Sequence, residues 1–401
     1  MREEWREVRL GDVAFRRTDF TPVFADQLYR VVGVQRSGWG LVDRDPMRGD
    51  SMKFDKLMEL HADDLVYRTI TAFEAPSTVV TSEFEGAFVT PQTFPVYSLD
   101  RSTLLPGYMA LLTTSPAFHE DMSSRCVGTV LRRKTLSKGA FESIPISLPP
   151  LIEQRRIVDL IAAVDDAIEA ADGEAEITAE ARRALWHGLA SKTVRVDRVG
   201  AVTQGKSLPK TIQGTVSGDI SWFKIADMTS PQNLFGYSEA DTRVSHAVLE
   251  SNGGKITPEG SVTFPRVGAA VATEKKRLLL SDAALDENHI AVTPLEQGIE
   301  EVTLAAFESV RLGGLVRSGA VPSLNMGLIR ELEIPWPADG VDLHEVDALL
   351  GASRSAERTA LANAGALRTL RSNLLTVLLS GEHEIPASYD QFLNLDEEAA
   401  A

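Results

Sequence analysis

The chain repeats itself, and this internal repeat constrains the fold more than any other feature of the sequence. Residues 10–13 (LGDV) resemble residues 199–202 (VGAV), an offset of 189 positions. Residues 141–149 (FESIPISLP) resemble residues 329–337 (IRELEIPWP) at an offset of 188, and the leucine-rich ends of the two copies match again at 189. Three matches in nearly one register, spread over the whole repeat, indicate two tandem copies of one unit.

Charge follows the same repeat. The net charge of −16 divides into −2 for residues 1–150, −5 for 151–191, −2 for 192–337 and −7 for 338–401. We therefore expect two large, nearly neutral domains, each followed by a short acidic segment. Because a polyanion can bind a basic face of a neutral domain, the acidity of the whole chain does not exclude a nucleic-acid partner.

The acidic segments are predicted to be long helices, at 151–191 and 338–382, the second followed by an acidic tail at 383–401. Their apolar residues recur mostly at intervals of three and four, which places them in one narrow stripe. Such a stripe is marginal alone, so we expect the two helices, each of about 60 Å, to pack as an antiparallel coiled coil. The alternative is that each helix packs only on its own domain. The expected inter-helix core or partner-contact residues are Ile157, Leu160, Ile161, Val164, Ile168 and Leu185 in the first helix and Val346, Leu349, Leu350, Leu367 and Leu374 in the second.

The large domains are predicted to be mixed α/β. Short β-type runs alternate with Gly, Pro and Asp turn signals and with helical stretches. Strands are expected at 28–34, 65–70, 87–89, 220–225, 261–264 and 289–293, and helices at 105–113 and 302–310.

Several functional classes lack the residues they need. No stretch approaches 18 consecutive apolar residues, so we expect no membrane span. A single cysteine, Cys126, forms no internal disulfide and suits a reducing cytoplasm. The chain has no phosphate-binding loop motif and no metal-ligand spacing among its seven histidines. These features favour a cytoplasmic protein that recognises or scaffolds and binds no metal or other cofactor.

One motif resembles a known family. Residues 144–158 (IPISLPPLIEQRRIV) resemble the segment that leads into the central helix of specificity subunits of Type I restriction–modification systems. Residues 199–206 and 218–227 are similar to the opening of a target-recognition domain of that family, and the likeness covers nearly the full length. The second unit departs from the pattern, because residues 336–340 read WPADG where the family has a Pro-Pro-x-x-Glu-Gln helix start.

The resemblance implies a DNA-reading subunit that is not itself catalytic. Residues 1–150 and 192–337 would be two target-recognition domains, and because they differ in sequence, the target would be bipartite and asymmetric. Two methyltransferase subunits would bind the helix pair, and a restriction subunit would join them. S-adenosylmethionine, ATP and Mg would belong to those partners.

Clustered cations are the candidate contacts to double-stranded DNA, since phosphate binding needs flexible positive charge and a guanidinium can reach guanine edges. Salt bridges within the protein are the alternative explanation. The candidates are Arg68, Arg132, Arg133, Lys134 and Lys138 in the first domain and Lys206, Lys210, Arg266, Lys275, Lys276 and Arg277 in the second.

Three other functions remain open at this stage. The chain could be a specificity subunit of another restriction type, which serves a fused nuclease–methyltransferase. It could be a tandem scaffold that binds only protein, for which the acidity is the best argument. A hidden enzyme would show catalysis by the purified chain alone.

Overall fold

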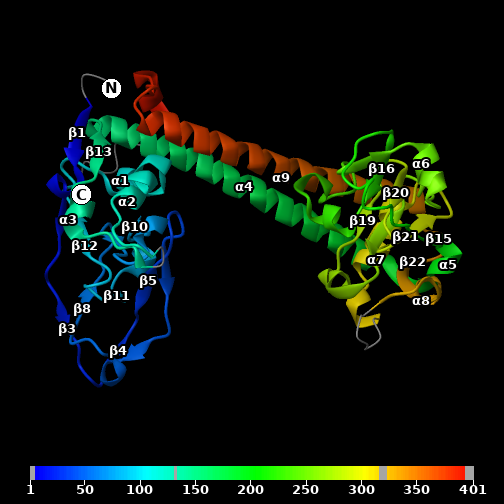
Figure 1. The fold of residues 1–401 in the computed structure, drawn as a ribbon, viewed down its shortest axis with the longest axis horizontal. Coiled ribbons are helices and arrows are strands. Elements are labelled where there is room, and N and C mark those ends of the chain that lie inside the picture. Colours follow the sequence, from blue (N-terminus) through cyan, green and yellow to red (C-terminus); the bar gives the residue numbers. More distant parts are fainter. Residues whose placement is uncertain (1–4, 131–132, 316–322, 393–401) are drawn as a thin grey trace. The chain divides into compact units, whose positions relative to one another are not determined.

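A computed structural model describes residues 5–130, 133–315 and 323–392, which form two compact units (Figure 1). The first unit comprises the residues up to Glu169 together with those from Gly365 on, and the second comprises Ala170–Ala364. Each unit contains one α/β domain and one part of a pair of long helices.

The domain of the first unit is built on a four-stranded antiparallel sheet in the order β10-β9-β12-β2. A three-stranded sheet, β11-β8-β3, and two small hairpins, β4-β7 and β5-β6, extend it. The strands are β1 (Arg6–Arg9), β2 (Ala14–Arg16), β3 (Thr21–Pro22), β4 (Leu28–Tyr29), β5 (Val32–Val34), β6 (Leu41–Asp43), β7 (Met47–Arg48), β8 (Lys56–Glu59), β9 (Leu65–Tyr67), β10 (Ser77–Val79), β11 (Phe88–Val89), β12 (Val96–Leu99) and β13 (Pro145–Leu148). The helices are α1 (Pro106–Thr114), α2 (Pro116–Ser124) and α3 (Lys138–Glu142).

The domain of the second unit has the same main sheet in the same order, β19-β18-β21-β15. Its second sheet is β17-β16-β20, in which β16 and β20 are parallel. The strands are β14 (Ala190–Arg195), β15 (Gly200–Gln204), β16 (Ile220–Phe223), β17 (Thr242–Val244), β18 (Val262–Pro265), β19 (Arg277–Leu278), β20 (Ala283–Leu285), β21 (His289–Pro294) and β22 (Glu333–Pro337). The helices are α5 (Val196–Val199), α6 (His246–Ser251), α7 (Glu300–Glu308) and α8 (Met326–Glu331).

The sequence repeat corresponds to the way each domain closes on itself. The first strand pairs antiparallel with the strand that precedes the long helix, β1 with β13 and β14 with β22. The backbone N–H of Leu10 donates to Ile144 O, and that of Val196 donates to Leu332 O in the same place. In the second copy the repeated glycine has a steric reason, since a Cβ on Gly200 would lie 2.4 Å from Val292 Cγ1.

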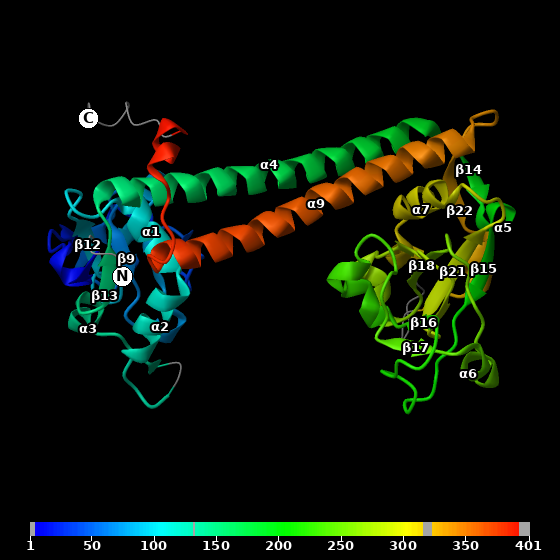
Figure 2. The same ribbon diagram turned by 90° about the horizontal axis from the view of Figure 1, so that it is seen from above.

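Two long helices, α4 (Leu151–Leu189) and α9 (Leu343–Leu379), follow β13 and β22 and lie side by side (Figures 1 and 2). Along each helix, residues that are buried or half-buried recur at alternating intervals of four and three positions, which is the spacing of a coiled-coil seam. The seam residues are 157, 161, 164, 168, 171, 175, 178, 182 and 185 in α4, and 346, 350, 353, 357, 360, 364, 367, 371, 374 and 378 in α9. Buried alanines occupy the middle of the seam in both helices, which permits close backbone approach.

Contacts between the helices show that they are antiparallel. In the first unit, Arg371 Nη2 donates to Asp165 Oδ2 at 2.9 Å. In the second unit, Ser353 Oγ donates to Thr178 O at 3.3 Å, and Arg182 Nη2 donates to Glu357 Oε2 at 3.1 Å. Higher residue numbers in α4 thus meet lower numbers in α9. The predicted fold, tandem mixed α/β domains with an antiparallel helix pair, is confirmed.

Each domain shares its core with the adjoining part of the helix pair, but the contacts between α4 and α9 show that the helices do not pack only on their own domains. Ile157, Ile161 and Leu378 join the main core of the first unit. Trp186, Val346 and Leu350 join that of the second. Of the other expected seam residues, Leu160, Val164, Ile168, Leu185, Leu367 and Leu374 are half-buried. Leu349 is 51% exposed and therefore lies outside the inter-helix core.

Candidate nucleic-acid interface

Arg68 follows β9 in the first domain and is held by contacts within the protein. Its Nη2 donates to Glu74 Oε2 at 2.9 Å and its Nε donates to Ile70 O at 3.0 Å. Arg68 therefore orders the segment 68–75, and a contact to guanine stays a prediction that requires the guanidinium to exchange these partners.

The predicted basic cluster of the first domain lies beside that same segment. Leu136 N donates to Thr69 O, and Ala72 N donates to Lys134 O. Arg133 is exposed, and Lys134 and Lys138 are half-buried. Arg132 lies outside the described residues. Among the described residues no ion pair involves Arg133, Lys134 or Lys138, and their contact with an external anion stays a prediction.

The cluster at 275–277 in the second domain is used largely within the fold. Lys276 is 6% exposed, and its ammonium donates to Glu274 Oε2 and to Val310 O. Arg277 donates to Asn233 O and Met228 O, and burial lowers the pKa of its guanidinium. A phosphate contact by either residue would break these bonds. Lys275 is half-buried and is the member of the cluster best placed to reach a ligand.

The remaining candidates lie on loops around the main sheet of the second domain. Lys206 and Lys210 are exposed. The Lys206 backbone is held in place, because its N–H donates to Leu285 O and its carbonyl accepts from Trp222 Nε1. Arg266 bridges two loops by donating to Leu324 O and Glu287 O, both at 3.3 Å.

Sequence reasoning missed an aromatic–cation pair in the first domain. The guanidinium carbon of Arg36 lies 4.2 Å from the ring centroid of Trp39, and the indole is 58% exposed. The only local signal in the sequence is the Gly38-Trp39-Gly40 string. An exposed tryptophan between two glycines would have been the better signal.

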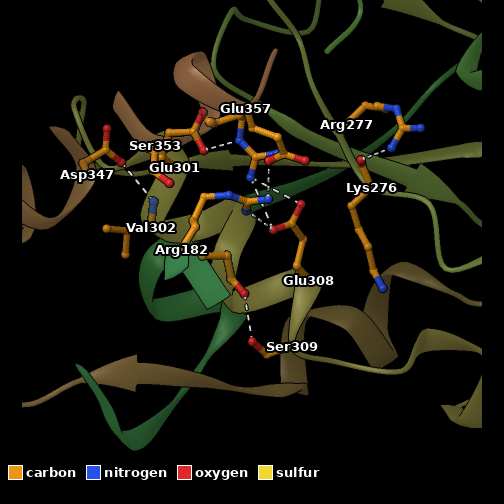
Figure 3. A network of polar contacts seen from close by, with 12 residues as sticks. Arg182, Lys276, Arg277, Glu301, Val302, Glu308, Ser309, Asp347, Ser353 and Glu357 are labelled. Carbon is orange, nitrogen blue, oxygen red and sulfur yellow. Dashed lines mark hydrogen bonds and ion pairs between the residues drawn. The ribbon is translucent and has the colours of Figure 1, made fainter. Parts of the chain in front are cut away.

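A network of ion pairs fastens α7 of the second domain to both long helices (Figure 3). Arg182 of α4 donates to Glu308 Oε2 at 2.9 Å and to Glu357 of α9 at 3.1 Å. Arg354 of α9 donates to Glu301 Oε2 at 2.6 Å and also contacts Glu308. Burial alone would lower the pKa of Arg354, but Glu308 and Glu301 raise it above its ordinary value.

In each unit, a polar side chain near the start of the long helix accepts a hydrogen bond from the start of a helix in the domain. Gln154 of α4 is fully buried, accepts from Leu105 N at the start of α1 and donates to Thr103 O and Pro149 O. In α9, Asp347 accepts from Val302 N at the start of α7 (Figure 3). A carboxylate in α9 thus contacts the start of α7, as the Gln154 amide in α4 contacts the start of α1, and burial raises the pKa of Asp347 to about 6.

Other kinds of site are not found in the described part of the chain. No group of three or more His, Cys, Asp or Glu side chains there is arranged to hold a metal ion. No helix in that part is both long enough and apolar enough to span a bilayer. The cavities are small or open; one of about 190 Å³ lies beside Arg182 and Trp186.

Comparison with known proteins agrees with this architecture. Residues 2–179 match the family model of the Type I restriction modification DNA specificity domain. None of the curated protein sequences compared with the chain is similar enough to count as a match.

Two solved structures share the fold over nearly the whole length. The crystal structure of the S subunit of a Type I restriction-modification system from M. genitalium has a TM-score of 0.59 at 12% identity, covering 93% of this chain and 96% of that one. A structure from work on complex assembly and conformational transition of the type I R-M system has a TM-score of 0.57 at 14% identity, covering 94% and 98%. The chain is therefore similar to Type I restriction–modification specificity subunits, in sequence over residues 2–179 and in fold over nearly its whole length.

Proposed function

We propose that this chain reads a bipartite, asymmetric site in double-stranded DNA and directs partner methyltransferase and restriction subunits to it. Residues 1–150 and 192–337 act as the two target-recognition domains, 151–191 and 338–382 as spacer helices, and 383–401 as a tail. S-adenosylmethionine, ATP and Mg are bound by the partner subunits. The chain binds DNA that the partner methyltransferase must also reach, so we place its action in the cytoplasm.

The observation that carries the proposal is the repetition of one sheet order on two unlike domains. Both main sheets have equivalent strands in equivalent order, yet the surrounding surfaces differ. The first domain carries the hairpins β4-β7 and β5-β6, and the second instead carries β16, β17 and α6. One scaffold with two different surfaces suits the reading of two different half-sites.

Exposed and half-buried cations supply the phosphate contacts in this proposal. Arg133, Lys134 and Lys138 serve the first half-site, and Lys206, Lys210 and Lys275 serve the second. Arg68, Arg266, Lys276 and Arg277 contribute by ordering the loops that carry the contacts, and they reach DNA only if their internal bonds open. Exposed apolar residues on the long helices are candidate contacts for the methyltransferase subunits, namely Ile177, Leu349, Leu361 and Leu370. The study of complex assembly in a similar system is in keeping with such partners.

The direct test is a map of methylated adenines in the host genome with and without the gene. We expect one split, asymmetric site to lose methylation when the gene is removed. Gel-shift titration with the partner methyltransferase adds a physical measure, because neutralised phosphates make affinity fall with salt by a logarithmic slope of about −0.9 per phosphate. A protein scaffold would give no sequence-dependent shift and no salt-dependent slope, and a fused nuclease–methyltransferase partner would identify another restriction type.

The helix pair allows a second test, of the proposal that helix length sets the gap between half-sites. Seven residues are inserted near Gly173 in α4 and seven near Ala362 in α9, between the Asp165–Arg371 and Arg182–Glu357 contacts. One heptad in each helix preserves the seam and adds about 10 Å to each helix, roughly three base pairs. We expect a longer gap with unchanged half-sites. Altered half-sites would contradict the proposal, and the insertion in α4 alone is the control for a broken seam.

A further inference from the structure

Trp39 is the exception among the tryptophans of this chain. Its indole is 58% exposed, whereas the other four tryptophans are at most 7% exposed. An indole left in water forgoes the burial free energy that the other four gain. The position is therefore a strong candidate for a contact made with a partner molecule.

The backbone around Trp39 is ordered by its own hydrogen bonds. Residues 35–40 connect β5 to β6, and we call them the β5-β6 tip. Gln35 N donates to Gly40 O, and Trp39 N donates to Arg36 O, both at 3.0 Å. Gly38 and Gly40 have φ values of 77° and 63°, a conformation that glycine adopts without strain. The turn thus presents Arg36 stacked on Trp39 before any partner arrives.

The β5-β6 tip is also anchored to the rest of the domain. Ser37 N donates to Glu74 O at 3.0 Å, and Ser37 Oγ donates to Thr113 O at 3.3 Å. A hollow of about 400 Å³ beside the tip is lined by Arg36, Ser37, Phe73, Glu74 and His119. These contacts reduce the entropy that the tip would lose on binding.

The same anchor connects the tip with the basic loop of the domain. Glu74, whose carbonyl holds Ser37, also pairs with Arg68 through its carboxylate, so its negative charge is compensated. Two residues earlier, Ala72 N donates to Lys134 O. Segment 68–75 therefore contacts two parts of the domain. Its Glu74 carbonyl binds the β5-β6 tip, and its Ala72 N–H binds the loop that contains Arg133 and Lys134.

We propose that Arg36 and Trp39 contact bases of the first half-site, while Arg133 and Lys134 bind phosphates of the same duplex. The indole makes apolar contacts with base edges in the groove, and the guanidinium, which lies on the indole face, donates to acceptors at those edges. This inference rests on the proposed DNA-binding function. The Arg133 and Lys134 cations on the loop that shares segment 68–75 with the tip favour a polyanion over an apolar protein surface.

Because the other tryptophans of the chain are buried, quenching of tryptophan fluorescence by acrylamide reports mainly on Trp39. The complex of the full chain with its methyltransferase is titrated with a duplex that carries the mapped target. The difference between the wild type and Trp39→Phe isolates the signal of residue 39 from that of the partner. We expect target DNA to protect Trp39 several-fold, and a duplex with a scrambled first half-site to protect it little.

Affinity is measured on the same complexes. We expect Trp39→Ala to weaken binding of the target about tenfold and to have little effect once the first half-site is scrambled. Arg36→Gln should act in the same direction and leaves the indole in place. Phe54→Ala, which removes another exposed aromatic side chain of this domain, is the matched control and should leave affinity unchanged.

Each contrary outcome has a distinct meaning. A wild-type complex that binds no specific DNA refutes the proposed function. A complex that binds normally, with unprotected Trp39 and undiminished affinity in Trp39→Ala and Arg36→Gln, refutes this inference alone. Protection of Trp39 by the methyltransferase without DNA would also overturn it and would assign the tip to a protein contact. An equal loss in Phe54→Ala would show that the effect is not specific to the β5-β6 tip.

Discussion

Replacing Arg354 with alanine tests whether the ion-pair network holds the second domain to the helix pair. The Arg354 side chain is 12% exposed, and its guanidinium meets Glu301 and Glu308 of α7. Its removal takes a cationic partner from both carboxylates, and among the described ion pairs Glu308 keeps the one with Arg182. Removing one partner of a buried pair costs about 3–5 kcal/mol. Glu308 is partly exposed to solvent, so we expect a loss of about 3 kcal/mol in the free energy of unfolding of the second unit.

Arg195→Ala is the matched control in the same unit. Arg195 also makes a two-pronged contact with a carboxylate, that of Asp197, but both side chains are substantially exposed. Exposed pairs contribute little because solvent screens their charges, so this variant should lose much less stability than Arg354→Ala. The two variants therefore differ mainly in the burial of the pair that is removed.

The assay is equilibrium unfolding of the full chain in urea, which does not screen charge as guanidinium salts do. Tryptophan fluorescence reports mainly on the second unit, because three of the five tryptophans, Trp186, Trp222 and Trp336, are buried there. Arg354→Met with Glu301→Gln should recover part of the loss, since an apolar stem then faces a neutral amide. Equal losses in Arg354→Ala and Arg195→Ala would refute the reasoning that burial of the network sets its contribution.

Three further predictions concern single positions. The pKa of Asp347 is raised to about 6 by burial, so the folded state binds its proton more tightly than the unfolded chain, and stability falls as pH rises from about 4 to 6. After allowance for its partial exposure, Asp347→Asn should gain about 1 kcal/mol in urea unfolding at pH 8 and less at pH 5; an equal gain at both would contradict this. Ala364→Leu should overfill the seam and lower the melting temperature at a cost of about 1–3 kcal/mol, whereas Ala362→Leu on the exposed face should not. Gln154→Ala should cost about 2 kcal/mol in unfolding of the first unit because it leaves buried groups unpaired; a loss no larger than in the exposed control Gln92→Ala would count against that role.

The expected strands and helices mostly correspond to elements of the structure, with one instructive exception. The apolar run at 28–34 was expected to be one strand, but it forms β4 and β5, which pair with different partners, β7 and β6. A run of β-forming residues predicts an extended backbone. It does not predict where the chain leaves one partner strand for another, because strand pairing depends on residues far away in sequence.

Charge is harder to interpret from sequence than apolar spacing. Lys276 and Arg277 stand in a run that is typical of a phosphate contact, yet they donate to Val310 O and Asn233 O inside their own domain. Arg36 and Trp39 carry no charge cluster, and the structure shows them stacked and exposed. A cation has the same sequence signature whether its partner is a carbonyl of a distant loop or a ligand.

Repeat, periodicity and a helix-start motif were enough to establish two tandem α/β domains and an antiparallel helix pair, because these features depend on local spacing and on the need of each apolar stripe to be covered. The folded chain was needed to show which cations are consumed by internal bonds, that Asp347 binds the start of α7 as Gln154 binds the start of α1, and that the β5-β6 tip meets the basic loop through residues 68–75. Such outcomes depend on contacts between segments tens of residues apart, and a linear pattern contains no record of those distances.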